Sequence, residues 1–174
     1  MIETPQSVIT NFFVNSVQAH NNRHKSLTLW QHSGYTLIKK ISPDENVIDI
    51  GCGRNLFKSF LPNLIGIDPA TDEADYKIPF LEFDTDQKFD VALCLGSVQF
   101  GTLDNIKKHL YKINSLLTPN GRIYWRCNGN TQTPDWFFKW TFELHQELST
   151  EFGYTLNEYK WDYYRIYAEW IRKS

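Results

Sequence analysis

Residues 47–55 decide the fold, and they read Val47-Ile48-Asp49-Ile50-Gly51-Cys52-Gly53-Arg54-Asn55. The first four residues are mostly apolar and β-branched, as in a short buried strand. Gly51 and Gly53 follow, and glycine allows a tight bend in which the backbone approaches a ligand closely. The stretch therefore predicts a strand that ends in a binding turn.

The spacing of these glycines separates two kinds of nucleotide-binding protein. A dinucleotide-binding fingerprint has glycine at the first, third and sixth places, but the sixth place here is Leu56. The residues Asp49, Gly51 and Gly53 resemble instead the first motif of class I S-adenosylmethionine-dependent methyltransferases. That family often has a third glycine where Asn55 stands, and asparagine tolerates left-handed backbone better than most residues.

A second apolar segment, residues 64–67, ends in Asp68, nineteen residues after Asp49. A carboxylate in this place can accept both hydroxyls of an adenosine ribose, because it offers two oxygens. The alternative is that Asp68 and Pro69 form only a turn. The family resemblance implies that Asp49 lies near the amino end of the cofactor's methionine part. It also implies that the glycine bend, Cys52 and Asn55 included, and Pro69 beside Asp68 border the cofactor.

Later segments extend the resemblance, which runs from about Val47 to Trp125. Residues 89–95 open with Phe-Asp-Val, as the family's fourth strand does, and they are almost entirely apolar, as a central parallel strand should be. Residues 122–126 follow a Pro-Asn-Gly turn, as its fifth strand does. Residues 154–171 read as a hairpin, and in this family the last strand of such a hairpin inserts antiparallel into the sheet.

We therefore expect an α/β fold. The sheet is predicted to be Rossmann-like, doubly wound and mostly parallel, with a C-terminal antiparallel hairpin, after two N-terminal helices at about 4–19 and 26–41. The length of 174 residues suits one domain. Its predicted parts are the N-terminal helices (1–45), a cofactor-binding core (46–127), and a C-terminal helix and hairpin (128–174).

Two further elements are predicted from local pattern. Residues 74–78 read as a short third strand, and the resemblance implies that residues here, Tyr76 and Ile78 among them, flank the adenine. Apolar spacing predicts a helix over about 133–152. We interpret His145, near the apolar face of this helix, as a structural histidine with satisfied ring nitrogens; the alternative is a catalytic base.

The loop after the strand at 89–95 is the second predicted site segment, because open α/β sheets bind ligands at the carboxyl ends of their strands. Leu95, Gly96 and Ser97 are expected to border the methionine part of the cofactor, and Gln99 to face the substrate. The alternative is a loop that its own glycines merely shape. Further substrate contacts are predicted at Trp30, Arg126 and Asn128. A tryptophan in a leading helix more often packs on the sheet, and an arginine at a strand end more often makes a surface ion pair.

Composition excludes several classes of protein. The net charge of -2 offers no basic surface for nucleic acid. The three cysteines have no spacing suited to zinc, so we expect no metal site and read them as free thiols in a reducing, cytoplasmic compartment. No apolar run approaches the length of a membrane span.

The resemblance implies a methyltransferase that uses S-adenosylmethionine and acts on a small molecule in preference to DNA. The Asn/Asp-Pro-Pro-Tyr/Phe signature of amino-methylating DNA enzymes is absent at residues 97–100, where Ser-Val-Gln-Phe stands. The sequence identifies no general base and no oligomeric state. The short sequence motifs of this chain are similar to those of compact methyltransferase-like proteins of bacteriophages and marine bacteria. Two alternatives stay open: a module that binds S-adenosylmethionine or S-adenosylhomocysteine without transfer, and another Rossmann-type nucleotide-binding enzyme.

Overall fold

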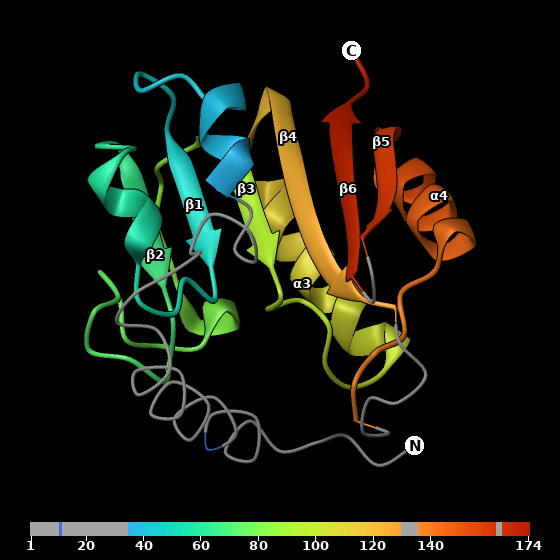
Figure 1. Ribbon diagram of the computed structural model, residues 1–174, viewed down its shortest axis with the longest axis horizontal. Coiled ribbons are helices and arrows are strands. Elements are labelled where there is room, and N and C mark those ends of the chain that lie inside the picture. The colour runs from blue at the N-terminus through green and yellow to red at the C-terminus, as the bar shows by residue number, and fades with distance from the viewer. Residues whose placement is uncertain (1–10, 12–34, 130–135, 163–164) are drawn as a thin grey trace.

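A computed structural model describes residue 11 and residues 35–129, 136–162 and 165–174 (Figure 1). In this part of the chain one sheet holds β1 (Val47–Ile50), β2 (Leu64–Ile67), β3 (Phe89–Leu95), β4 (Leu117–Asn128), β5 (Tyr154–Asp162) and β6 (Arg165–Arg172). The helices are α3 (Leu103–Leu116) and α4 (Phe142–Glu151), with short 3-10 helices η1 (Tyr35–Lys40), η2 (Leu56–Ser59) and η3 (Phe80–Glu82). The predicted N-terminal helices, and Trp30 with them, lie outside the described residues apart from residue 11 and the segment that forms η1.

The strand order is β2-β1-β3-β4-β6-β5. The strands β2, β1, β3 and β4 run parallel to one another, whereas β6 is antiparallel to both β4 and β5. This arrangement confirms the predicted α/β sheet with its antiparallel C-terminal hairpin. Because the four parallel strands point the same way, their carboxyl ends meet at one edge of the sheet, the lower edge in Figure 1.

The two faces of the sheet bury different cores, because successive side chains of a strand point to opposite sides. One face, which we call the α-face, packs residues such as Ile48, Ile50 and Trp125 against α3 and α4. The other, the η-face, packs Leu93, Leu95, Tyr124 and others against η1 and η2. The sheet is therefore covered on both sides, as a parallel sheet must be.

The helix predicted at 133–152 is shorter than expected, because α4 begins only at Phe142. Residues 136–140 are extended and follow the loop after β3: the Gly101 amide donates to the Trp136 carbonyl (2.8 Å) and the Phe138 amide to the Gln99 carbonyl (2.8 Å). Thr141 then caps α4 by accepting a hydrogen bond from the Leu144 amide (3.2 Å). Tertiary hydrogen bonds have here prevailed over a helical apolar pattern.

The predicted third strand at 74–78 is reduced to one parallel bridge, between Ile67 and Tyr76. Beside this bridge a side chain replaces the missing strand, since the Gly66 amide donates to Asp75 Oδ2 (2.8 Å). Lys58 pairs with the same carboxylate (2.8 Å). Burial raises the pKa of Asp75, but these hydrogen bonds and Lys58 hold it below its ordinary value. The outer edge of β2 is thus satisfied without a full strand.

Candidate functional site

The bend after β1 depends on left-handed backbone. Gly51 has φ of 71° and Gly53 has φ of 54°, a region that other residues rarely adopt. An added Cβ at Gly51 would lie within 3.0 Å of the Ser97 Cβ, so this glycine lets the bend touch the loop after β3. No atom of the described residues lies within 4 Å of the same position at Gly53. The backbone of Gly53 therefore has room for close approach by a ligand.

Asn55 takes the backbone that a third glycine would have, with φ of 51° and ψ of 37°. Its side chain, however, points to the β2 edge. Nδ2 donates to the Glu73 carbonyl (3.1 Å) and to Asp75 Oδ2 (3.2 Å). Gly66 leaves the space for this amide, because an added Cβ there would overlap it. Asn55 thus supports the bend from outside through its side chain. That Asn55 also contacts a cofactor stays a prediction.

Asp68 ends β2 and faces the glycine bend. Its side chain is buried, with 7% of the residue exposed, and Oδ2 accepts a hydrogen bond from the Gly53 amide (3.0 Å). Oδ1 accepts from the Ala70 amide (2.7 Å), which closes the turn around Pro69. The turn and the site interpretation are therefore compatible, because each carboxylate oxygen can accept a second hydrogen bond.

Asp49 lies in β1 directly before the bend and is 2% exposed. Burial raises its pKa to about 7; the positive charge of Arg126 acts against this rise and the charge of Asp68 adds to it. The thiol of Cys52, in the bend itself, also has a raised pKa, because it is half-buried and the charges of Asp49 and Asp68 act on it. The site thus holds acidic groups with little access to water.

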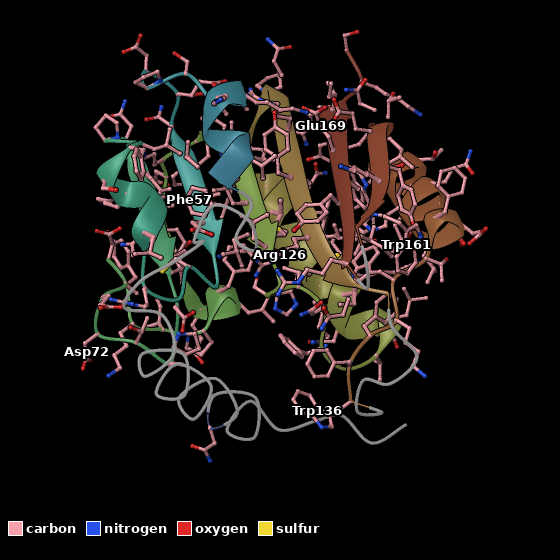
Figure 2. The ribbon with its side chains drawn as sticks, viewed as in Figure 1. Phe57, Asp72, Arg126, Trp136, Trp161 and Glu169 are labelled. Atoms are coloured by element: carbon pink, nitrogen blue, oxygen red, sulfur yellow. The ribbon has the colours of Figure 1, made fainter. Side chains whose placement is uncertain are left out.

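The loop after β3 meets β4 through Arg126, which Figure 2 shows near the ends of these two strands. Its Nη2 donates to the Leu95 carbonyl (2.5 Å). Gly96 has φ of 96°, and an added Cβ would come within 3.0 Å of the same nitrogen. Arg126 is thus half-buried and held beside the site, which differs from a surface ion pair.

Gln99 is buried in this loop, with 5% of the residue exposed. Its Nε2 donates to the Gly96 carbonyl (2.9 Å) and its Oε1 accepts from the Asn128 amide (2.9 Å). The amide therefore bonds to its own loop through Nε2 and to the end of β4 through Oε1. That Gln99 also faces the substrate stays a prediction.

Ser97 lies at the contact between the bend and this loop. Its hydroxyl is buried and has no hydrogen-bond partner among the residues that the structure describes. A buried hydroxyl without a partner is costly, so a ligand with a polar group here would find a favourable place.

The other predicted residues are arranged as follows. Tyr76 is 45% exposed and rests edge-on against Phe83, with 4.9 Å between ring centroids. Ile78 and Pro69 are half-buried, and Ile78 packs on the α-face core. The residues that meet at the carboxyl edge are Asp49, Gly51, Cys52, Gly53, Asp68, Leu95, Gly96, Ser97, Arg126 and Asn128.

Sequence reasoning missed two supporting features. Gly66 and Asp75 brace the bend from the β2 edge, and no motif signals them. Phe100, Phe137 and Trp136 form an aromatic cluster beside the loop after β3, with 4.9 Å between the first two rings. Their aromatic character could have suggested this, but only the fold brings residues 100 and 136–137 together.

His145 is structural, as expected, but not in the way expected. It is 0% exposed and stacks on Trp140, with 4.4 Å between centroids. Neither ring nitrogen has a hydrogen-bond partner within the described ranges. Burial lowers its pKa to about 3, so the ring is neutral in the folded protein. It lies among aromatic rings on the α-face, and a catalytic base is excluded by this burial.

Within 35–129, 136–162 and 165–174, no group of three or more His, Cys, Asp or Glu side chains is placed to hold a metal ion. None of the helices found in these ranges has the length and apolar character that crossing a membrane requires.

No protein-family model matches the chain, and no curated protein matches its sequence. Solved structures do match. The 1,6-didemethyltoxoflavin-N1-methyltransferase of Burkholderia thailandensis, with its substrate and S-adenosylhomocysteine bound, is 16% identical and superimposes with a TM-score of 0.77 over 99% of this chain and 94% of its own.

Two other structures, both with S-adenosylhomocysteine bound, match over most of the chain. The magnesium protoporphyrin IX methyltransferase of Synechocystis has a TM-score of 0.72 at 13% identity, covering 97% of this chain and 100% of its own. The N-methyltransferase NodS of Bradyrhizobium japonicum has a TM-score of 0.68 at 16% identity, covering 93% of this chain and 99% of its own. At such low sequence identity, the structural likeness establishes the fold alone. The chain has the fold of the class I S-adenosylmethionine-dependent methyltransferases.

Proposed function

We propose that this protein is an S-adenosylmethionine-dependent methyltransferase that acts on a small molecule. The observation that carries the proposal is the hydrogen bond from the Gly53 amide to Asp68, which joins a glycine bend and a strand-end carboxylate at one edge of the sheet. The three similar structures described above each hold S-adenosylhomocysteine, the product that remains after S-adenosylmethionine has given up its methyl group.

The residues present suit this cofactor. The carboxylate of Asp68 would accept from the ribose hydroxyls, and Asp49 would attract the ammonium group of the methionine part. Among the described residues, nothing obstructs the approach of a cofactor to the Gly53 backbone, and the Ser97 hydroxyl, without a partner there, offers a further polar contact. Tyr76, Ile78 and Pro69 would border the adenine.

When bound, S-adenosylmethionine supplies an activated methyl group on its sulfonium. The task of the chain is then to hold the acceptor in line with that group, which accounts for much of the rate in such reactions. Gln99 keeps the loop after β3 fixed to the end of β4. Arg126, Asn128 and Trp30 are the residues we propose to lie near the acceptor.

A small-molecule acceptor is supported by the names of the similar enzymes, which methylate a toxoflavin precursor and a magnesium porphyrin. The sequence also lacks the signature of amino-methylating DNA enzymes after β3. We further infer a cytoplasmic location, because Cys52, Cys94 and Cys127 are all free thiols.

Calorimetric titration tests the proposal. Wild-type protein is expected to bind S-adenosylhomocysteine and not NADH. Asp68→Ala should weaken S-adenosylhomocysteine binding at least tenfold. The matched control is Asp84→Ala. The Asp84 side chain is 96% exposed, and its ion pair with Lys112 is long, at 3.9 Å, so little should depend on it. Equal affinities in the two variants, or binding of NADH alone, would contradict the proposal.

Label transfer separates an enzyme from a module that only binds. Protein, radioactively methylated S-adenosylmethionine and a small-molecule cell extract are incubated together, and label is measured in the fraction that passes a filter retaining macromolecules. Label in that fraction supports a small-molecule methyltransferase. Cofactor binding without any transfer would favour the non-catalytic module.

A further inference from the structure

We propose that Arg126 is a positioning residue that favours the ionised form of the buried Asp49, so that binding of the cofactor's amino-acid end is linked to release of a proton from Asp49. This inference rests on the proposed function, since it concerns the same site. It goes further by assigning a role to a strand-end arginine that does not have to touch the ligand.

The register of the sheet places the two residues on the same face. Asp49 in β1 is paired with Leu93 of β3, and Arg126 in β4 is paired with Leu95, two residues further along β3. Leu93 and Leu95 belong to the η-face core. Asp49 alternates with Ile48 and Ile50, which face the other side. Asp49 and Arg126 therefore flank β3 on the η-face.

The guanidinium is anchored. Its Nη2 donates to the Leu95 carbonyl (2.5 Å) and lies against Gly96, where an added side chain would have no room. Both residues are withdrawn from water, since Asp49 is 2% exposed and Arg126 is half-buried. Charges interact more strongly under such conditions than at an exposed surface.

The other charged and titratable groups around Asp49 do not replace Arg126. Asp68, which follows β2, repels the Asp49 carboxylate. The thiols of Cys52 in the bend and Cys94 in β3 have raised pKa values, so they stay uncharged. Among the described residues, Arg126 is the cation that stabilises the ionised form of Asp49.

Arg126 is in turn surrounded by groups of β6. Arg165 acts against its charge, whereas Tyr167, paired with it across the sheet, acts in its favour. Burial of Asp49 and its attraction to Arg126 therefore oppose each other, and the balance leaves the pKa of Asp49 at about 7.

The affinity of the protein for the cofactor should therefore depend on pH. The cofactor's ammonium group is attracted by the carboxylate and not by the neutral acid. Affinity should therefore rise with pH up to about 7 and level off above that value. Without Arg126, burial acts unopposed and the midpoint of this rise moves to higher pH.

The experiment is calorimetric titration of the full chain with S-adenosylhomocysteine between about pH 5.5 and about pH 9. The control ligand is 5′-methylthioadenosine, which has the same nucleoside but lacks the ammonium and carboxylate. For wild-type protein we expect affinity for S-adenosylhomocysteine to fall about tenfold per pH unit below the midpoint. Affinity for 5′-methylthioadenosine should not change over this range.

Variants of Arg126 and Asp49 complete the test. Arg126→Met should move the midpoint upward by about one pH unit or more, and Arg126→Lys should keep it near the wild-type value because the charge is retained. Asp49→Asn should remove the pH dependence, which identifies Asp49 as the linked group. If Arg126→Met fails to fold, Arg126→Gln removes the same charge and keeps a donor for the Leu95 carbonyl, so the same upward shift is expected. An unchanged midpoint in Arg126→Met, or the same pH dependence for both ligands, overturns the inference. Absence of S-adenosylhomocysteine binding at every pH would instead contradict the proposed function.

Discussion

At the scale of single residues, Gly51, Gly53 and Asn55 share left-handed backbone but have different surroundings. Gly51 presses against Ser97, Gly53 has space beside it, and Asn55 uses its side chain to hold the β2 edge. The three residues of the bend therefore have different roles: Gly51 packs against a neighbouring loop, Gly53 leaves space, and the Asn55 side chain supports the bend.

Alanine substitutions separate these roles, with Gly153→Ala as the matched control. Gly153 has φ of 83° and no described atom within 4 Å of an added Cβ, so its substitution should cost only the strain of left-handed backbone, about 1–2 kcal/mol of unfolding free energy. Gly53→Ala should cost a similar amount of stability but weaken S-adenosylhomocysteine binding. Gly51→Ala should cost more stability than either, because it adds a clash. Chemical denaturation and calorimetry measure the two effects, and equal stability losses at Gly51 and Gly153 would contradict this account.

His145 makes stability depend on pH. Its pKa is about 3 in the folded protein, against an ordinary value of 6.5. Below about pH 6.5 the unfolded chain binds a proton that the folded chain does not, so stability falls as pH falls. The His145 contribution should decrease by about 1.4 kcal/mol per pH unit between these two values.

The comparison with His145→Leu isolates this contribution, because leucine carries no charge at any pH. Urea denaturation of both proteins between about pH 7 and about pH 4.5 gives the difference in unfolding free energy. Wild-type protein should lose stability faster than the variant on acidification. Parallel pH profiles for the two proteins would mean that His145 gains a proton in the folded state.

At the scale of elements, α4 illustrates how a cap and a competing contact set a helix boundary. Thr141→Ala removes the hydrogen bond from the Leu144 amide and should lower the unfolding free energy by about 1 kcal/mol, with no effect on S-adenosylhomocysteine affinity. Thr102 caps α3 in the same way, through the Asn105 amide (3.3 Å), but follows the loop after β3 directly. Thr102→Ala should therefore cost similar stability and also reduce affinity. An unchanged stability in Thr141→Ala would mean that the cap does not define the start of α4.

The sequence predicts the central strands well, but not the start of α4. Strands such as β3 are buried on both sides, so their apolar runs are unambiguous. Residues 136–140 also have a helical apolar spacing, yet they are extended because they bond to the loop after β3. No local pattern contains that partner. The same holds for the third strand, whose place is taken by a single bridge and the Asp75 side chain.

The candidate site divides in the same way. Asp49, Gly51, Gly53 and Asp68 could be found from spacing, because each occupies a motif position next to a recognisable strand. The supporting role of Gln99 could not, since it depends on hydrogen bonds to Gly96 and to a residue of β4.

At the scale of the whole molecule, the position of β6 between β4 and β5 is the feature that distinguishes this sheet from other Rossmann-like sheets. This order, together with parallel strands β2, β1, β3 and β4, places the bend, Asp68 and the loop after β3 at one edge. The two faces are covered by different helices, so the residues of the candidate site gather where strands end. The fold thereby explains why side chains from four strands and their loops can meet in one site.

A crystal structure of the protein with S-adenosylhomocysteine would test the central claim most directly. The account predicts that the ribose hydroxyls lie within hydrogen-bond distance of the Asp68 carboxylate, that the backbone of Gly53 borders the ligand, and that the amino end lies next to Asp49. A ligand bound at another place, or an Asp68 carboxylate that bonds only to Gly53 and Ala70 while the ribose lies elsewhere, would contradict it.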